Sequence, residues 1–257
     1  MIKFHTSFPN GGYCNVLMQN LILSIIGEKF NLKPQYNFTS KSPLAEYNLW
    51  QDPPGNCELG ILSKNFNFYY EGRELHDNWK IVDEFNHDYP PEKLMELNSV
   101  DFPIIYCGYG QKKCLLYDQY GETDLLLKTI NKNCIEHHNK VFVHVRLGDQ
   151  EHNTIGLEYY EKCLKNIDSF DGGSISSDSP NNSIVQYLSS TYNLEIFDSK
   201  DFREVIDYAT KFEYRVVTGG SSGWMIGMLG DNDNVYYVKS AYYWPEELFF
   251  NPKWKGY

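Results

Sequence analysis

The residues best placed to do chemistry lie in one short stretch, residues 140–149, with the sequence Lys-Val-Phe-Val-His-Val-Arg-Leu-Gly-Asp. The stretch begins with β-branched and aromatic residues typical of a strand, and Gly148 then allows a turn. This pattern predicts His144, Arg146 and Asp149 at the carboxyl end of a buried strand, where open α/β sheets bind ligands. Arginine suits a phosphate there because its planar fork offers charge and paired donors together. An ordinary core strand with a local ion pair at its end is the alternative interpretation.

The elements that would position these residues alternate between strand-like and helix-like patterns through the second half of the chain. Strands are expected to begin near residues 140, 173, 195, 214 and 235, and helices to cover 157–167, 182–192, 201–211 and the residues from 224. This alternation predicts a parallel sheet with right-handed crossovers. All strand-to-helix turns of such a sheet lie on one rim, so Arg146, Asp178 and the Ser221–Ser222 pair can meet around one ligand.

Each of these turns has a simpler interpretation as well. The Gly-Gly-Ser-Ser sequence at 219–222 supplies a helix N-terminus and two hydroxyls. These groups either bind phosphate oxygens or form a plain capping turn. Asp178 either accepts from a nucleobase or ribose, or caps the helix after Pro180. The sequence Asp-Asn-Asp-Asn at 231–234 mimics a metal-binding Asp-x-Asp, but its place before a strand predicts a turn.

The first half of the chain begins with a possible strand at residues 2–4, a glycine loop at 9–12 and an amphipathic helix at 15–31. This order points backbone N–H groups at an anion, although neither G-x-G-x-x-G nor a P-loop is present. Further elements are expected as strand-like pieces at 60–62, 66–70 and 102–106 and a helix at 124–133. Cys134, His137 and His138 suggest a metal site, but a solvated turn is the preferred interpretation because adjacent histidines point apart.

Composition excludes several classes of protein. The chain has 257 residues, enough for one large domain or two lobes, and 42% hydrophobic residues argue against intrinsic disorder. A net charge of −11 argues against a nucleic acid partner. The six cysteines form no C-x-x-C pair and are expected to be mostly reduced and buried. We find no apolar signal region and no stretch long enough for a membrane span, which predicts a cytoplasmic protein.

Five motifs together resemble the GDP-fucose fucosyltransferases, and the α1,2-fucosyltransferase (glycosyltransferase family 11-like) group most closely. The sequence at 144–149 resembles the His-x-Arg-x-x-Asp signature of that superfamily. The other four similar segments follow in the family's order, at residues 11–19, 107–113, 177–180 and 220–224. The resemblance implies a GT-B-like α/β fold with two Rossmann-like lobes, an acceptor-side lobe at 1–135 and a GDP-sugar-binding lobe at 136–257.

The resemblance also implies an activity, the inverting and metal-independent transfer of fucose or a related sugar from a GDP-sugar to a hydroxyl of a glycan or glycoconjugate. It assigns Arg146 to the donor pyrophosphate and His144 to the shape of its turn. The remaining donor-binding positions that it implies are Asp178 near guanine and ribose, Ser221 and Ser222 at phosphate, and Gly12 and Asn15 closing the cleft. The expected partners are the GDP-sugar and the glycan, with no cofactor.

The general base and the acceptor stay open. Asp149 and Glu151 are the nearest carboxylates that could remove the acceptor's proton, and Glu151 is preferred because the turn's own backbone can hold Asp149. Leu147 stands where the α1,2 and α1,6 enzymes commonly have a second arginine, which puts the linkage and the sugar in doubt. The alternatives are a glycan-binding module without catalysis and another nucleotide-dependent α/β enzyme.

Overall fold

The protein has an α/β fold built from two compact units, Met1–Asn131 and Lys132–Tyr257. The computed structural model describes residues 4–7, 13–15, 17, 33–35, 60–65, 80–83, 104–107, 130–147, 155–239 and 253–257. The expected boundary after residue 135 and the roles given to the two lobes stay predictions.

A four-stranded parallel sheet forms the described part of the first unit. Its strands are β1 (Phe4–Ser7), β2 (Lys33–Gln35), β3 (Lys80–Asp83) and β4 (Ile104–Cys107). They lie in the order β2-β1-β4-β3, and every pair is parallel. The 3-10 helix η2 (Gly60–Asn65) is hydrogen-bonded to Asn131, the last residue of this unit, since the Asn65 side chain donates to the Asn131 carbonyl at 2.8 Å.

The second unit holds a six-stranded parallel sheet. Its strands are β5 (His137–Val145), β6 (Gly173–Ser177), β7 (Leu194–Ile196), β8 (Phe212–Val216), β9 (Val235–Tyr237) and β10 (Lys255–Gly256). Its helices are α5 (Leu157–Lys165), α6 (Ser183–Tyr192), α7 (Phe202–Ala209) and α8 (Ser221–Leu229). The predicted alternation of strand and helix in this half is therefore confirmed.

The strands of this sheet lie in the order β10-β9-β8-β5-β6-β7. From the central β5 the chain winds outward through β6 and β7, and then returns to β8 on the other side of β5 and continues through β9. This is the strand order of the doubly wound dinucleotide-binding fold, in which the winding reverses between the two central strands. Ligands bind outside the carboxyl ends of the strands at that switch point, which here lies between β5 and β8.

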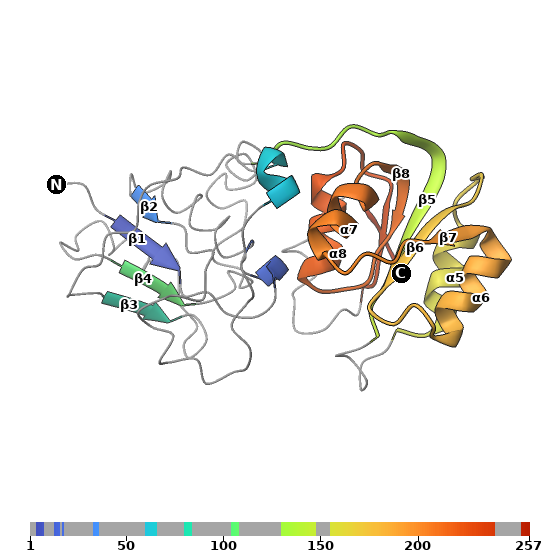
Figure 1. Ribbon diagram of the computed structural model, residues 1–257, viewed down its shortest axis with the longest axis horizontal. Coiled ribbons are helices and arrows are strands. Elements are labelled where there is room, and N and C mark those ends of the chain that lie inside the picture. Colours follow the sequence, from blue (N-terminus) through green and yellow to red (C-terminus); the bar gives the residue numbers. More distant parts are fainter. Residues whose placement is uncertain are drawn as a thin grey trace. The chain divides into compact units, whose positions relative to one another are not determined.

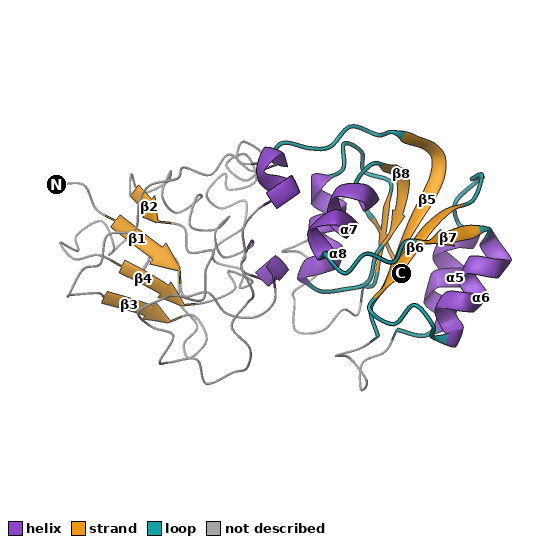
Figure 2. Cartoon of the chain, viewed as in Figure 1, coloured by secondary structure: helices purple, strands orange, loops and turns teal. Residues whose placement is uncertain are grey.

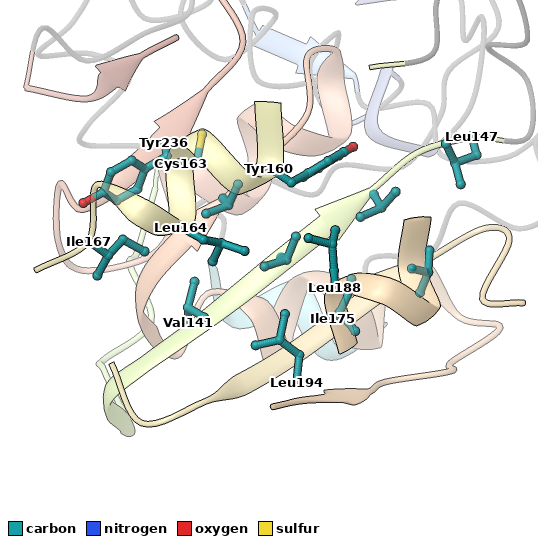
Figure 3. Packing of buried hydrophobic residues seen from close by; sticks show 14 residues of the cluster. Val141, Leu147, Tyr160, Cys163, Leu164, Ile167, Ile175, Leu188, Leu194 and Tyr236 are labelled. Carbon is teal, nitrogen blue, oxygen red and sulfur yellow. The ribbon is translucent and has the colours of Figure 1, made fainter. Parts of the chain in front are cut away.

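The helices cover both faces of the sheet (Figures 1 and 2). Residues of α5 and α6 pack with alternate residues of β5 on one face, where Val141, Val143 and Val145 form the centre of the hydrophobic core (Figure 3). The residues between them face α7, since the His144 ring lies 5.7 Å from the Phe202 ring. Period-2 alternation along the buried part of β5 thus sends the polar His144 to one face and the three valines to the other.

Helix α8 differs from the others because almost none of it reaches solvent. Every residue of α8 except Met228 is buried. A surface helix usually has an apolar stripe on one side and polar residues on the other. Helix α8 has no such pattern, because neighbouring parts of the unit surround it. Gly227 makes room for Trp254, whose ring would lie 2.3 Å from a Cβ at that position. The α8 backbone is therefore fixed from several sides.

Three local predictions were wrong. Residues 60–62 belong to η2 and form no strand, since a short apolar run does not distinguish strand from helix. The last residues of the helix expected at 124–133 form isolated bridges, including Asn133 with Gly230. His137 and His138 lie in β5 and form no turn; His137 packs on Phe212 with ring centroids 4.3 Å apart.

Other predicted elements lie partly or wholly outside the residues that the structure describes. The expected strand at 66–70 and most of the helix at 15–31 lie outside the described residues. Of the described cysteines, Cys14 and Cys163 are buried and Cys134 is exposed, and none of these three forms a disulfide. In the part of the chain that the structure describes, no helix is long and apolar enough to cross a membrane.

Candidate ligand site at the carboxyl edge of the sheet

Arg146 follows the last residue of β5 and lies at the switch point of the sheet. Its side chain is half-buried. A Cβ added at Gly220 would lie 3.5 Å from a guanidinium nitrogen of Arg146. The structure therefore brings the arginine at the end of one central strand against the turn that follows the other, β8, as the sequence predicted.

The turn after β8 leads directly into the N-terminus of α8. Gly220 is the N-cap residue, at a φ of 91°, and makes no side-chain cap. The first hydrogen bond of the helix runs from the Trp224 N–H to the Gly220 carbonyl at 3.1 Å. The N–H groups of the first turn thus have no acceptor within the helix, and they carry the positive end of its dipole. Together with Arg146 they form a site for an anion.

Ser221 and Ser222 are the first two residues of α8, which begins three residues earlier than the sequence predicted. Both are 7% exposed. The Ser222 hydroxyl is buried and has no hydrogen-bond partner among the described residues. A buried hydroxyl without a partner costs about 1 to 3 kcal/mol, so one at a helix N-terminus is well suited to a bound anion.

Gly223 explains how this turn packs so tightly. A Cβ at Gly223 would lie 1.9 Å from the Thr218 carbonyl oxygen, a contact with backbone that no side-chain movement relieves. Only glycine therefore lets the turn between β8 and α8 close this tightly.

His144 is too buried to line the site, but it contacts the turn that does. It is 4% exposed, and its Nδ1 lies 3.4 Å from the Thr218 hydroxyl, which joins β5 to the turn after β8. Burial, and after it the nearby Arg146, lower the pKa of His144 to about 4, although Asp178 opposes the shift. His144 is therefore neutral near pH 7.

This buried histidine predicts a loss of stability in mild acid. The pKa of His144 is about 4 in the folded chain and 6.5 in the unfolded chain, so only the unfolded chain takes up the proton between these values. The contribution of the neutral His144 to the free energy of unfolding is fully present above pH 6.5. It falls as the pH drops towards 4 and is about 2 kcal/mol smaller at pH 5. We expect urea denaturation to show that a His144→Gln variant loses about 2 kcal/mol less than the wild type between pH 7 and pH 5. Equal losses in the two proteins would contradict this account.

Asp178 joins the ends of β5 and β6. Its Oδ1 accepts a hydrogen bond from the Leu147 N–H at 2.9 Å. Asn182 and not Asp178 caps the next helix, since the Asn182 side chain accepts from the Ile184 N–H at 2.9 Å. The N-cap interpretation of Asp178 is thus wrong. Its carboxylate is anchored and exposed at the rim, where it repels phosphate and suits a ligand's hydroxyl or N–H donors.

The structure does not test the remaining candidate residues. Gly12, Asp149 and Glu151 lie outside the described residues. Asn15 is half-buried in a helical turn of the other unit. The roles given to these four residues therefore stay predictions.

The Asp-x-Asp mimic at 231–234 is a turn, as predicted. The side chain of Asn232 accepts from the Asn234 N–H at 3.1 Å and from the Arg215 guanidinium at 2.8 Å. Among the described residues, no group of three His, Cys, Asp or Glu side chains is arranged to hold a metal ion.

The geometry of the rim suits a ligand with an anionic part and a polar neutral part. The anionic part would meet Arg146 and the start of α8, and the neutral part the anchored Asp178. Sequence reasoning found these elements, the Gly-Gly-Ser-Ser turn included, but missed Thr218, which supports the turn. The contact of Thr218 with His144 joins residues 74 positions apart, and no local pattern indicates it.

Comparison with known proteins supports the fold. No protein-family model matches the sequence, and no curated protein matches it. Among solved structures, the chain is similar to an arginine-to-lysine mutant of Arabidopsis thaliana FUT1 in complex with GDP, with a TM-score of 0.53 and 8% sequence identity. The likeness covers 92% of this chain and 70% of that chain.

FUT1 is a fucosyltransferase of the GT-B fold. At this level of identity the likeness concerns the fold alone. The predicted GT-B-like α/β fold is confirmed. The closeness to the α1,2 group stays a prediction.

Proposed function

We propose that the protein is a glycosyltransferase that moves fucose, or a related sugar, from a GDP-sugar to a hydroxyl of a glycan or glycoconjugate. One observation carries the proposal. Arg146 and the N-terminus of α8 meet at the switch point of the sheet. The likeness to GDP-bound FUT1 supports guanosine diphosphate as the ligand, with its diphosphate as the anionic part and its nucleoside as the neutral part.

The proposed chemistry follows from the charges at this edge. Breaking the bond between sugar and GDP develops negative charge on the β-phosphate and positive character on the sugar. A guanidinium and a helix N-terminus that are already in place stabilise that charge more in the transition state than in the ground state. In this proposal Arg146 and α8 supply the positive charge that a metal ion supplies in other transferases, so the reaction proceeds without one.

The acceptor side of the reaction rests on the sequence. A carboxylate near the acceptor hydroxyl removes its proton as the oxygen attacks the sugar from the face opposite GDP, which inverts the configuration. We propose Glu151, or Asp149, as this base. Both follow Arg146 closely in the sequence, and a residue just beyond the phosphate-binding strand end can reach a sugar attached to that phosphate.

The proposal predicts selective stabilisation by guanine nucleotides. Thermal denaturation is measured with GDP, UDP and ADP at equal concentration, each with and without EDTA. We expect GDP to raise the melting temperature most, by an amount set by its affinity and concentration, and EDTA to leave the increase unchanged.

Activity is then measured as GDP released from GDP-fucose in the presence of glycan acceptors. A preference for UDP or ADP would contradict the proposed donor. Strict dependence of turnover on a divalent ion would contradict the proposed role of Arg146 and α8. Glycan binding without any affinity for GDP would favour a binding module of the same fold.

A further inference from the structure

A second buried hydroxyl at the carboxyl side of the sheet has no partner. Tyr160 lies on α5 and is 0% exposed, and its hydroxyl oxygen has no hydrogen-bond partner among the described residues. Buried tyrosine hydroxyls usually find a partner, since leaving one unpaired costs about 1 to 3 kcal/mol. A buried group that bears this cost calls for an explanation.

The position of the ring shows which part of the molecule the hydroxyl can serve. Tyr160 packs in the same cluster as Leu147 and Ile175, between α5 and the strands β5 and β6. In Figure 3 its hydroxyl oxygen extends from the ring in the direction of Leu147, at the carboxyl end of β5. The hydroxyl thus lies beneath the rim and not at the amino end of the sheet.

Asp178 is the charged group of the rim that is linked to this cluster through Leu147. Its Oδ1 accepts from the backbone N–H of Leu147, the same residue whose side chain packs in the cluster with Tyr160. Burial, together with the nearby Cys163 and Asp178, raises the pKa of Tyr160, so the hydroxyl keeps its proton. A protonated phenol is a hydrogen-bond donor and a carboxylate is an acceptor, so the two groups are chemically complementary.

We propose that Tyr160 is a positioning residue of the nucleotide site, whose hydroxyl donates to the Asp178 carboxylate when a nucleoside diphosphate binds. With Leu147 and Tyr160 bonded to it from the protein side, the carboxylate is held in place to accept from hydroxyl and N–H groups of the nucleoside. The unpaired hydroxyl of the free protein then becomes paired in the complex, which favours the bound state. This inference rests on the proposed function, because it places the nucleoside at Asp178.

The test compares Tyr160→Phe with the unaltered protein by calorimetric titration with GDP and, separately, with inorganic pyrophosphate. We expect the affinity for GDP to fall about tenfold, the worth of one hydrogen bond to a charged group. Pyrophosphate lacks the nucleoside and binds at Arg146 and α8, so its affinity is expected to stay unchanged. The melting temperature of the free variant is expected not to fall, because phenylalanine removes an unpaired hydroxyl and keeps the ring.

Two neighbouring tyrosines provide controls. The Tyr159 hydroxyl donates to the Val217 carbonyl at 2.6 Å, so Tyr159→Phe is expected to lower the melting temperature. The exposed Tyr187 donates to Glu161 at 3.1 Å, and Tyr187→Phe is expected to change neither stability nor affinity.

The outcomes separate this inference from the function on which it rests. No binding of GDP by the unaltered protein overturns both. Normal GDP binding by Tyr160→Phe overturns the role of Tyr160 alone. An equal loss for GDP and pyrophosphate, or a melting temperature lowered as in Tyr159→Phe, shows a merely structural role and also overturns it.

Discussion

Replacing Arg146 by alanine is expected to slow sugar transfer by about 100-fold to 1,000-fold, or about 3 to 4 kcal/mol of transition-state stabilisation. The guanidinium lies against Gly220, at the N-terminus of α8. In the proposed reaction it faces the oxygen atoms on which negative charge develops. Alanine removes that charge and leaves the helix end as the remaining positive group of the pair.

The measurement is the steady-state rate of GDP release from the GDP-sugar at saturating donor, with binding of GDP followed separately. Arg146→Lys is the matched variant, since lysine keeps the charge and loses the planar pair of donors. We expect it to recover part of the rate and to remain clearly below the wild type. A rate for Arg146→Ala within a few-fold of the wild type would remove Arg146 from the proposed mechanism. An intact melting temperature is required for either result to count.

Replacing Arg215 by alanine is expected to destabilise the second unit by about 3 to 5 kcal/mol, from the cavity that it leaves and the buried acceptors that lose their donor. Arg215 lies in β8 and is 0% exposed. Its guanidinium donates to the Thr210 carbonyl at 3.2 Å and to the Asn232 carbonyl at 2.5 Å. Burial lowers the pKa of Arg215 to about 10, which still leaves it charged at pH 7. Alanine leaves buried acceptors unpaired and opens a cavity beside Gly230, where a Cβ would meet the guanidinium.

Urea denaturation at pH 7 measures this change in the free energy of unfolding. Arg203→Ala is the control, because Arg203 pairs with Asp201 at 2.6 Å and is 30% exposed at its side chain. Such a partly exposed pair contributes at most about 1 kcal/mol. Should the two variants lose equal stability, the buried position of Arg215 would not be the cause of its effect.

Much of the second unit could be predicted because local signals agree with the global fold. Asn182 and Asp201 stand at the starts of α6 and α7 and cap them, as residues of their type do. Strand and helix alternate, so the parallel sheet and the single rim follow. Arg146 could be assigned to the rim for the same reason, from a strand pattern that ends at a glycine turn.

The rest depended on contacts between distant residues. Trp224 is where the apolar run of α8 begins, and the helix itself starts at Ser221 because the Gly219–Gly220 backbone can turn tightly there. Asp178 accepts a hydrogen bond from the backbone of Leu147, just after β5, and no local sequence pattern indicates this contact. In β5, Asn139 has a φ of 55°, and the register with β8 shifts between His137 and Val141. The first four residues of this strand are all polar, so they show no alternation of polar and apolar residues from which a strand could be predicted.

The enclosure of α8 has a consequence for how a ligand is bound. A helix held on every side cannot tilt or slide to meet an anion, so its N-terminal N–H groups keep one direction with or without a ligand. Binding a diphosphate there orders almost no backbone, and little of the interaction energy is lost as conformational entropy. The site is thus preorganised, and its preference among phosphorylated ligands is set by the rim side chains around the helix, above all Arg146 and Asp178.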